Sequence, residues 1–96
     1  MPFLLWRNSL RPWKLHISQS VLKDLRDLPK EARGRAALSI LELAATPYPH
    51  GVEKLKGYEH SYRVRIGDYR IVYEVAGNEV AIIAVSHRKD VYRELK

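Results

Sequence analysis

The 96-residue sequence contains no cysteine, which excludes disulfide bonds, thiolate nucleophiles and cysteine-based zinc sites. It also lacks a long hydrophobic run: the stretch Val80 to Val85 is far shorter than the roughly 20 residues that a membrane-spanning helix needs. Met1 to Leu10 has no basic segment ahead of its apolar residues and does not resemble a secretory signal. We therefore expect a cytoplasmic protein with no membrane partner.

The length and composition favour a single small globular domain. Apolar residues make up 46% of the chain and charged residues 29%, which argues against disorder. We expect residues 1–12 to form an N-terminal arm and residues 13–96 to form the domain. Lys and Arg outnumber Asp and Glu by 17 to 11, giving a formal charge of +6. This excess predicts attraction to polyanions, although many small domains are basic without binding any.

The first half of the domain has the pattern of a strand followed by two helices. Trp13, Leu15 and Ile17 alternate with polar residues, which is typical of a half-buried strand. Ser18 or Ser20 is suited to cap the helix that follows. A second helix is predicted from Pro29 to Ala45. The predicted apolar faces of the two helices are Val21, Leu22, Leu25 and Leu28, then Ala36, Ala37, Ile40, Leu41 and Ala44.

The second half predicts two β-hairpins. The pairs Gly67-Asp68 and Gly77-Asn78 each begin with glycine, which suits a two-residue hairpin turn. Pairing outward from these turns brings Ile66 opposite Tyr69 and Ala76 opposite Glu79. The fold class is therefore α+β: an N-terminal strand, a two-helix hairpin, an antiparallel three-stranded meander and a short C-terminal helix after His87.

This register assigns the strand residues to two faces of the sheet, because paired residues share a face. The predicted core face is apolar: Tyr62, Val64, Ile66, Tyr69, Ile71, Tyr73, Val75, Val80, Ile82 and Ala84. The predicted opposite face carries the charged groups: Arg63, Arg65, Arg70, Val72, Glu74, Ala81, Ile83, Val85 and His87.

Arg65 and Arg70 face each other directly in this register. Like charges opposite one another destabilise a sheet by roughly 0.2–1 kcal/mol, so the pair needs an explanation. One is an ordinary ion-pair network with Asp68, Glu74 or Glu59. The interpretation that we favour is an anion site, because the guanidinium fork matches phosphate oxygens.

Several further residues are candidates for the same site. His87 is the one histidine on the predicted charged face, and histidine is the residue type best suited to proton transfer near neutral pH. Arg88 and Tyr92 follow it, and Lys54 and Lys56 precede the sheet as candidate phosphate contacts. Each of these residues could instead be an ordinary surface or core residue with no role in a site.

Other kinds of site are not expected. His16, His50 and His60 lack metal-ligand spacing, and no glycine-rich phosphate loop is present, so we expect neither a metal nor a nucleotide cofactor. His60 has the parity of the core face and is predicted to be structural.

The order of these motifs resembles the RelE/ParE toxin superfamily, on the RelE side, over Trp13 to Leu95. The resemblance rests on a strand and helical hairpin followed by three motifs: Lys54-Leu55-Lys56-Gly57, then Tyr62-Arg63-Val64-Arg65-Ile66-Gly67-Asp68-Tyr69-Arg70-Ile71-Val72-Tyr73, then Val85-Ser86-His87-Arg88-Lys89-Asp90-Val91-Tyr92. It implies the toxin of a type II toxin–antitoxin pair, which enters the ribosomal A site and cuts mRNA. In such enzymes the 2′-hydroxyl attacks the adjacent phosphate without a metal.

The resemblance also implies roles for particular residues. Arg63 and Arg65 stand where RelE-type toxins often carry lysines, while Arg70, Arg88 and Tyr92 match family positions. Because arginine does not lose its proton, the arginines are interpreted as charge stabilisers, His87 as general base or acid, and Tyr92 as a group that stacks on or orients the substrate. The implied partner is an acidic, RelB-like antitoxin that covers the segment from Arg88 to Tyr92.

Two other functions remain open at this point. The ParE-like branch of the superfamily shares the scaffold but inhibits DNA gyrase without cutting RNA. A non-catalytic module that binds nucleic acid or a protein partner is also compatible with arginines in place of lysines.

Overall fold

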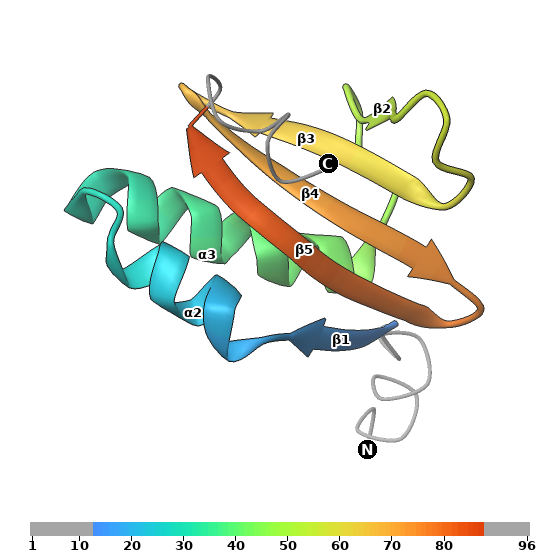
Figure 1. Cartoon of the computed structure of the whole chain (residues 1–96), viewed down its shortest axis with the longest axis horizontal. Coiled ribbons are helices and arrows are strands. Elements are labelled where there is room, and N and C mark those ends of the chain that lie inside the picture. Colours follow the sequence, from blue (N-terminus) through green and yellow to red (C-terminus); the bar gives the residue numbers. More distant parts are fainter. Residues whose placement is uncertain (1–12, 88–96) are drawn as a thin grey trace, which may run out of the picture.

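The computed structural model describes residues 13–87 as an α+β domain (Figure 1). The predicted strand, helical hairpin and meander are confirmed. The predicted N-terminal arm and C-terminal helix lie outside the described residues. In chain order the elements are β1 (Lys14–Ile17), α2 (Gln19–Arg26), α3 (Lys30–Ala45), β2 (Glu53–Lys54), β3 (Ser61–Ile66), β4 (Tyr69–Ala76) and β5 (Glu79–His87).

The strands form one sheet in the order β1-β5-β4-β3-β2. The strands β2 to β5 pair antiparallel, whereas β1 pairs parallel with β5, so that Leu15 lies opposite Val80. The N–H of Lys14 also donates to the carbonyl of Asn78 (2.7 Å). The first strand of the chain therefore lies at one edge of the sheet, next to the last strand, and β2 lies at the other edge.

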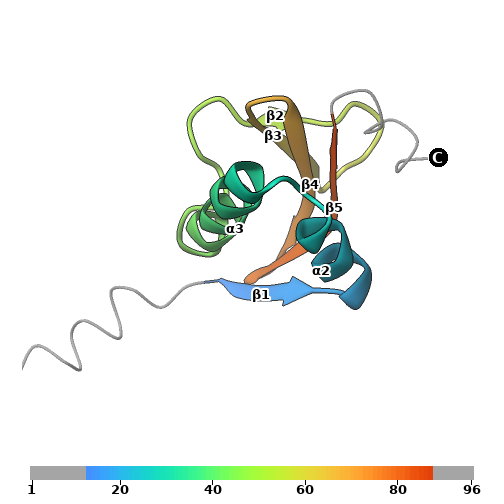
Figure 2. The ribbon, with the colours of Figure 1, turned by 90° about the vertical axis from the view of Figure 1, so that its left-hand side faces the viewer.

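The two helices pack on one face of this sheet (Figure 2). Ser18 begins α2, because its side-chain oxygen accepts from the N–H of Val21 (3.1 Å), and Pro29 precedes the first turn of α3, where its missing N–H costs nothing. None of the helices among residues 13–87 is long and apolar enough to cross a membrane.

Some of the apolar residues that were predicted to be buried on the two helices are exposed. Leu41 is 63% exposed and Leu22 is 39% exposed, although both were placed on the core faces. Leu43 is buried in place of Leu41. In α3, apolar residues occur all around the helix, so spacing alone does not mark its buried side.

The main core lies between the helices and the helix-facing side of the sheet. Tyr73 is fully buried there, and its hydroxyl donates to the carbonyl of Pro47 (2.6 Å). The other buried members of this cluster are Val21, Leu25, Leu28, Ala36, Ile40, Leu43, Ile71, Val75, Val80, Ile82 and Val85. A second, smaller cluster of Leu55, Val72 and Ala84 lies apart from it.

Both predicted hairpin turns are present with the predicted register. Gly67 and Gly77 each have φ +59°, and glycine in this conformation at the first turn position fits a type II′ hairpin. Ile66 pairs with Tyr69, and Ala76 pairs with Glu79.

A β-bulge in β5 changes the faces beyond it. Val72 pairs with Ala84 while the next residue, Tyr73, pairs with Ile82, which leaves Ile83 without a partner. One extra residue reverses the side-chain alternation. The predicted faces of Ala84 and Val85 were therefore wrong: Val85 belongs to the main core and Ala84 to the second cluster.

Candidate anion-binding site

The sheet face turned away from the helices carries three arginines. We call this surface the arginine face and define it by Arg63, Arg65, Arg70 and Ser86. The register pairs Arg65 with Arg70 and Arg70 with Ser86, so these three residues form a row across β3, β4 and β5. The predicted convergence of the arginines on one face is confirmed.

Arg65 and Arg70 are direct cross-strand partners, as the sequence predicted. The Arg65 side chain is exposed and has no hydrogen bond or ion pair within residues 13–87, whereas Arg70 is half-buried and its Nη1 donates to the carbonyl of Tyr69 (3.3 Å). Two guanidinium groups opposite one another repel, at a cost of about 0.2–1 kcal/mol. A bound anion would remove this cost by accepting hydrogen bonds from both.

Arg63 is held by an acidic side chain. Its Nε and Nη2 both donate to Oε1 of Glu53, at 3.3 and 3.0 Å, and its side chain is only 13% exposed. The sequence had proposed Asp68, Glu74 or Glu59 as the balancing acid, but Glu53 fills this position for Arg63. Strand β2 explains the contact, since it pairs Glu53 with Arg63.

His87 lies on the opposite side of the sheet from the arginine face, contrary to the sequence prediction. It pairs with Tyr69, and the two rings meet edge to face with centroids 5.5 Å apart. Tyr69 packs against the main core. The bulge at Ile83 is the cause, because it shifts the alternation of every later residue in β5. Ser86, which is only 8% exposed, takes the position on the arginine face instead.

The remaining predicted residues do not join the arginine face within the described structure. Lys54 pairs with Tyr62 and therefore alternates away from Glu53 and Arg63. It lines a shallow hollow together with Lys56 and the neighbouring loop up to Glu59. Arg88 and Tyr92 lie outside the described residues.

The histidines of the first sixty residues occupy separate places. Nε2 of His16 contacts Glu79 at 2.8 Å, and Nε2 of His60 lies 3.9 Å from Glu59. The His60 side chain is 60% exposed, so its predicted place on the core face was wrong. Within residues 13–87, no group of three or more His, Asp or Glu side chains could hold a metal ion.

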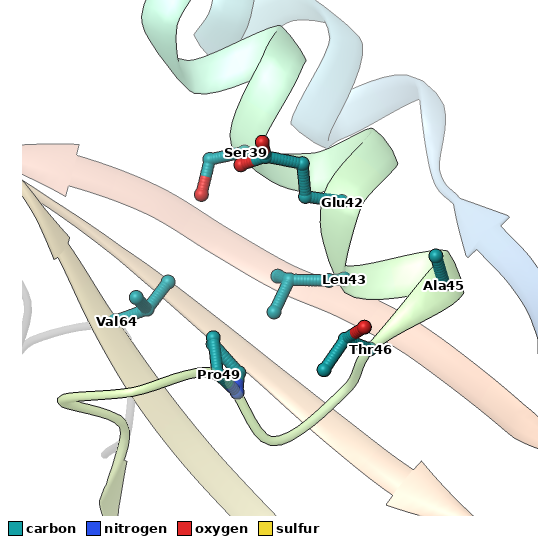
Figure 3. Close-up of a pocket in the computed structure, with 7 residues that line it drawn as sticks. All are labelled: Ser39, Glu42, Leu43, Ala45, Thr46, Pro49 and Val64. Carbon is teal, nitrogen blue, oxygen red and sulfur yellow. The ribbon is translucent and has the colours of Figure 1, made fainter.

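A cavity of about 420 Å³ lies on the helix-facing side, between the C-terminal half of α3 and β3 (Figure 3). Leu43, Pro49 and Val64 provide its apolar walls, and Glu42 provides its carboxylate. Because Val64 alternates with Arg63 and Arg65 along β3, this cavity is separated from the arginine face by the sheet.

Three tyrosine rings pack against one another on the helix-facing side of the sheet. The Tyr62 ring stacks on Tyr73 with centroids 5.8 Å apart, and its other neighbour is Tyr48 at 5.2 Å. Burial raises the pKa of Tyr73 well above its ordinary value, and the neighbouring tyrosines Tyr48 and Tyr62 add to this effect. Tyr73 is thus a neutral hydrogen-bond donor in the core.

Sequence reasoning missed two residues of the site. Glu53 was missed because a two-residue strand is too short to show a periodicity in the sequence. Ser86 was missed because the bulge occurs inside the apolar run Val80 to Val85, which has no polar residue to reveal a change of parity.

The comparisons with known proteins agree on one family. The family model described as "ParE toxin of type II toxin-antitoxin system, parDE" matches residues 15–92. Toxin RelE3 of Methanocaldococcus jannaschii is 35% identical over 83 residues, which cover 82% of this chain and 94% of the relative.

Solved structures of RelE toxins share the fold. The toxin–antitoxin complex RelB-RelE from Methanococcus jannaschii matches with a TM-score of 0.69 and 33% identity, covering 80% of this chain and 94% of the matched chain. A mutant of the E. coli toxin RelE in the free state matches with a TM-score of 0.70 and 26% identity, covering 86% and 93%. The chain therefore belongs to the RelE/ParE superfamily of toxins of type II toxin–antitoxin systems.

Proposed function

We propose that this toxin is an endoribonuclease that cleaves mRNA on the ribosome and holds the reacting phosphate on the arginine face. The observation that carries this proposal is the direct opposition of Arg65 and Arg70. Like charges at opposite positions of a sheet repel one another, and an RNA phosphate accepts hydrogen bonds from both guanidinium groups.

The proposed reaction needs no oxidant or reductant, because the RNA loses one proton and gains another and one P–O bond replaces another. The 2′-hydroxyl loses its proton, and its oxygen bonds to the adjacent phosphorus. The bond from phosphorus to the 5′-oxygen then breaks, and that oxygen takes up a proton. The products are a 2′,3′-cyclic phosphate and a 5′-hydroxyl. Arg65 and Arg70 stabilise the negative charge that develops on the phosphate oxygens, while Arg63, held by Glu53, borders the site.

The proton transfers involve groups other than the arginines, because a guanidinium group stays protonated. His87 is paired with Tyr69 across the sheet from Arg65 and Arg70, so we assign it no direct role at the phosphate. We propose that Arg88 and Tyr92, which follow this strand in sequence, complete the site by contacting a second phosphate and by stacking on a base.

We also propose an acidic, RelB-like antitoxin as the partner of this toxin. Two observations support it: the formal charge of +6, which favours an acidic partner, and the existence of RelB-RelE complexes of relatives. The antitoxin is proposed to cover the segment from Arg88 to Tyr92.

The experiment that tests the function is the mapping of RNA ends after brief induction of the wild-type chain and of His87→Ala. Cuts within translated messages that carry 2′,3′-cyclic phosphate and 5′-hydroxyl ends are expected. The His87→Ala variant is expected to cut within a few-fold of the wild-type rate.

Two outcomes would contradict this account. Intact messages together with gyrase-dependent DNA breaks would replace the ribonuclease with a ParE-like gyrase inhibitor. Loss of cleavage in His87→Ala, with its fold retained, would return the imidazole to the mechanism.

A further inference from the structure

Arg35 of α3 approaches the arginine-rich hairpin from the helical side. An ideal Cβ placed on Gly67 would lie 3.5 Å from Nη2 and 3.6 Å from Nη1 of Arg35, so the guanidinium group of Arg35 rests against the β3–β4 turn. In Figure 1 the N-terminal half of α3 lies at the same end of the molecule as this turn and the end of β5.

Guanidinium groups therefore flank the β3–β4 turn from both sides of the sheet. Arg65 and Arg70 belong to the two strands that enter and leave the turn, and Arg35 lies over the turn itself. The acidic group at this place is the exposed Asp68. Within residues 13–87 neither Arg35 nor Arg65 forms an ion pair with it.

Arg35 also lines a hollow of about 580 Å³ on α3, together with Lys30, Glu31, Gly34 and Leu38. Leu38 is 58% exposed and provides an apolar surface beside the two cations. Glu31 disfavours an anion on its own side of the hollow, so an anion is expected at the Arg35 side, nearest the turn. The guanidinium group of Arg35 suits a phosphate of the RNA backbone, and the exposed Leu38 side chain beside it offers an apolar contact surface.

We propose that Arg35 binds an RNA phosphate next to the one held by Arg65 and Arg70, so that the RNA strand continues around the β3–β4 turn onto the hollow of α3. This inference rests on the proposed ribonuclease function and extends its substrate surface to the helical layer. RNA is favoured over an acidic protein segment because Arg35 rests against the turn that joins the strands of Arg65 and Arg70, so successive phosphates of one strand can contact all three guanidinium groups. Arg35 is a substrate-positioning residue, and it takes no part in proton transfer.

The test compares Arg35→Gln with Arg33→Gln, because residues two apart on a helix point about 200° away from each other. Both side chains are exposed, and both substitutions remove one charge. The probe is a single-stranded oligonucleotide of mixed sequence, 2′-O-methylated at every position so that it has no nucleophile. Affinity is measured by fluorescence anisotropy over a range of salt concentrations, and cleavage of a translated message is measured in a cell-free system.

We expect Arg35→Gln to weaken binding on the order of tenfold and to reduce the slope of log affinity against log salt by about 0.7. We expect it to raise KM for cleavage with little change in kcat, while Arg33→Gln stays within about twofold of wild type. Equal effects of the two variants in both assays would overturn the inference.

Two further results would also decide the matter. If Arg35→Gln weakens only the complex with the antitoxin, the hollow binds protein and the inference is wrong. If the wild-type chain neither binds nor cleaves RNA, the proposed function fails first, which distinguishes that failure from a failure of Arg35 alone.

Discussion

The two faces of the sheet differ in how neighbouring side chains interact: apolar groups pack together on one face, and like charges lie opposite each other on the other. On the helix-facing side, Ile71 and Tyr73 are fully buried among apolar groups, and the Tyr73 hydroxyl has its hydrogen bond. On the arginine face, Arg65 and Arg70 oppose each other. The helix-facing side buries apolar groups and satisfies their polar atoms, whereas the arginine face brings two like charges to opposite positions, which we propose serve to bind a phosphate.

The largest expected effect is on activity and comes from the arginine face. Arg70→Ala removes a group proposed to stabilise the charge on the reacting phosphate, and such losses lower the rate about 10²–10³-fold. The thermal midpoint is measured beside the rate, so that a loss of catalysis is separated from a loss of fold. The rate of cleavage of a translated message, with Arg33→Ala as the control, checks this prediction. A variant that cleaves at the wild-type rate would remove Arg70 from the mechanism.

The second effect is on stability and comes from the helix-facing side. Tyr73→Phe leaves the buried carbonyl of Pro47 without its donor, which we expect to lower the free energy of unfolding by about 1–3 kcal/mol. Urea unfolding measures it. Tyr48→Phe is the control, because Tyr48 is 50% exposed, and it is expected to change stability by less than about 0.5 kcal/mol. Equal losses in both variants would show that the buried hydrogen bond of Tyr73 adds no more to the free energy of unfolding than an exposed tyrosine hydroxyl does.

The same tyrosine predicts a loss of stability in alkali. Burial raises the pKa of Tyr73 in the folded state, so above about pH 10 the unfolded chain releases a proton that the folded chain keeps. Stability is therefore full below pH 10 and falls above it, by about 1.4 kcal/mol per pH unit for one such group. Unfolding curves at pH 9 to 11 should show a steeper fall for wild type than for Tyr73→Phe, and parallel curves would contradict the assignment.

The smallest effect has the opposite sign. Arg65→Gln removes one of the two opposed guanidinium groups, so we expect the free energy of unfolding to rise by about 0.2–1 kcal/mol while cleavage falls. Urea unfolding at low salt detects the gain best, because salt screens the repulsion. Arg33→Gln should show no such gain. A loss of stability in Arg65→Gln would mean that the arginine face is not strained.

The contrast between the faces also explains which features the sequence revealed. The turns at Gly67 and Gly77 have a distinctive residue type, and counting from them gave the correct pairing of Arg65 with Arg70. The positions of Arg63 and Arg70 on one face followed from the same count. These inferences succeeded because they depend on local backbone geometry and on a period of two.

The failures depend on contacts that no local pattern encodes. The bulge at Ile83 lies within an unbroken apolar run, so the sequence gives no sign of it. The prediction therefore assumed unbroken alternation and placed His87 on the wrong face. The ion pair between Glu53 and Arg63 requires the two-residue strand β2, which forms only against β3. The exposure of Leu41 is decided by which side of an apolar helix meets the sheet. Each of these outcomes is set by tertiary packing.

The most direct test of the central claim is a double-mutant cycle of Arg65→Gln and Arg70→Gln on the free energy of unfolding, with and without the 2′-O-methylated oligonucleotide. Without RNA the coupling between the two arginines should be repulsive, by about 0.2–1 kcal/mol. With saturating RNA it should become favourable, because both side chains then hold one phosphate. A coupling that is already favourable without RNA, or one that RNA leaves unchanged, would contradict the account.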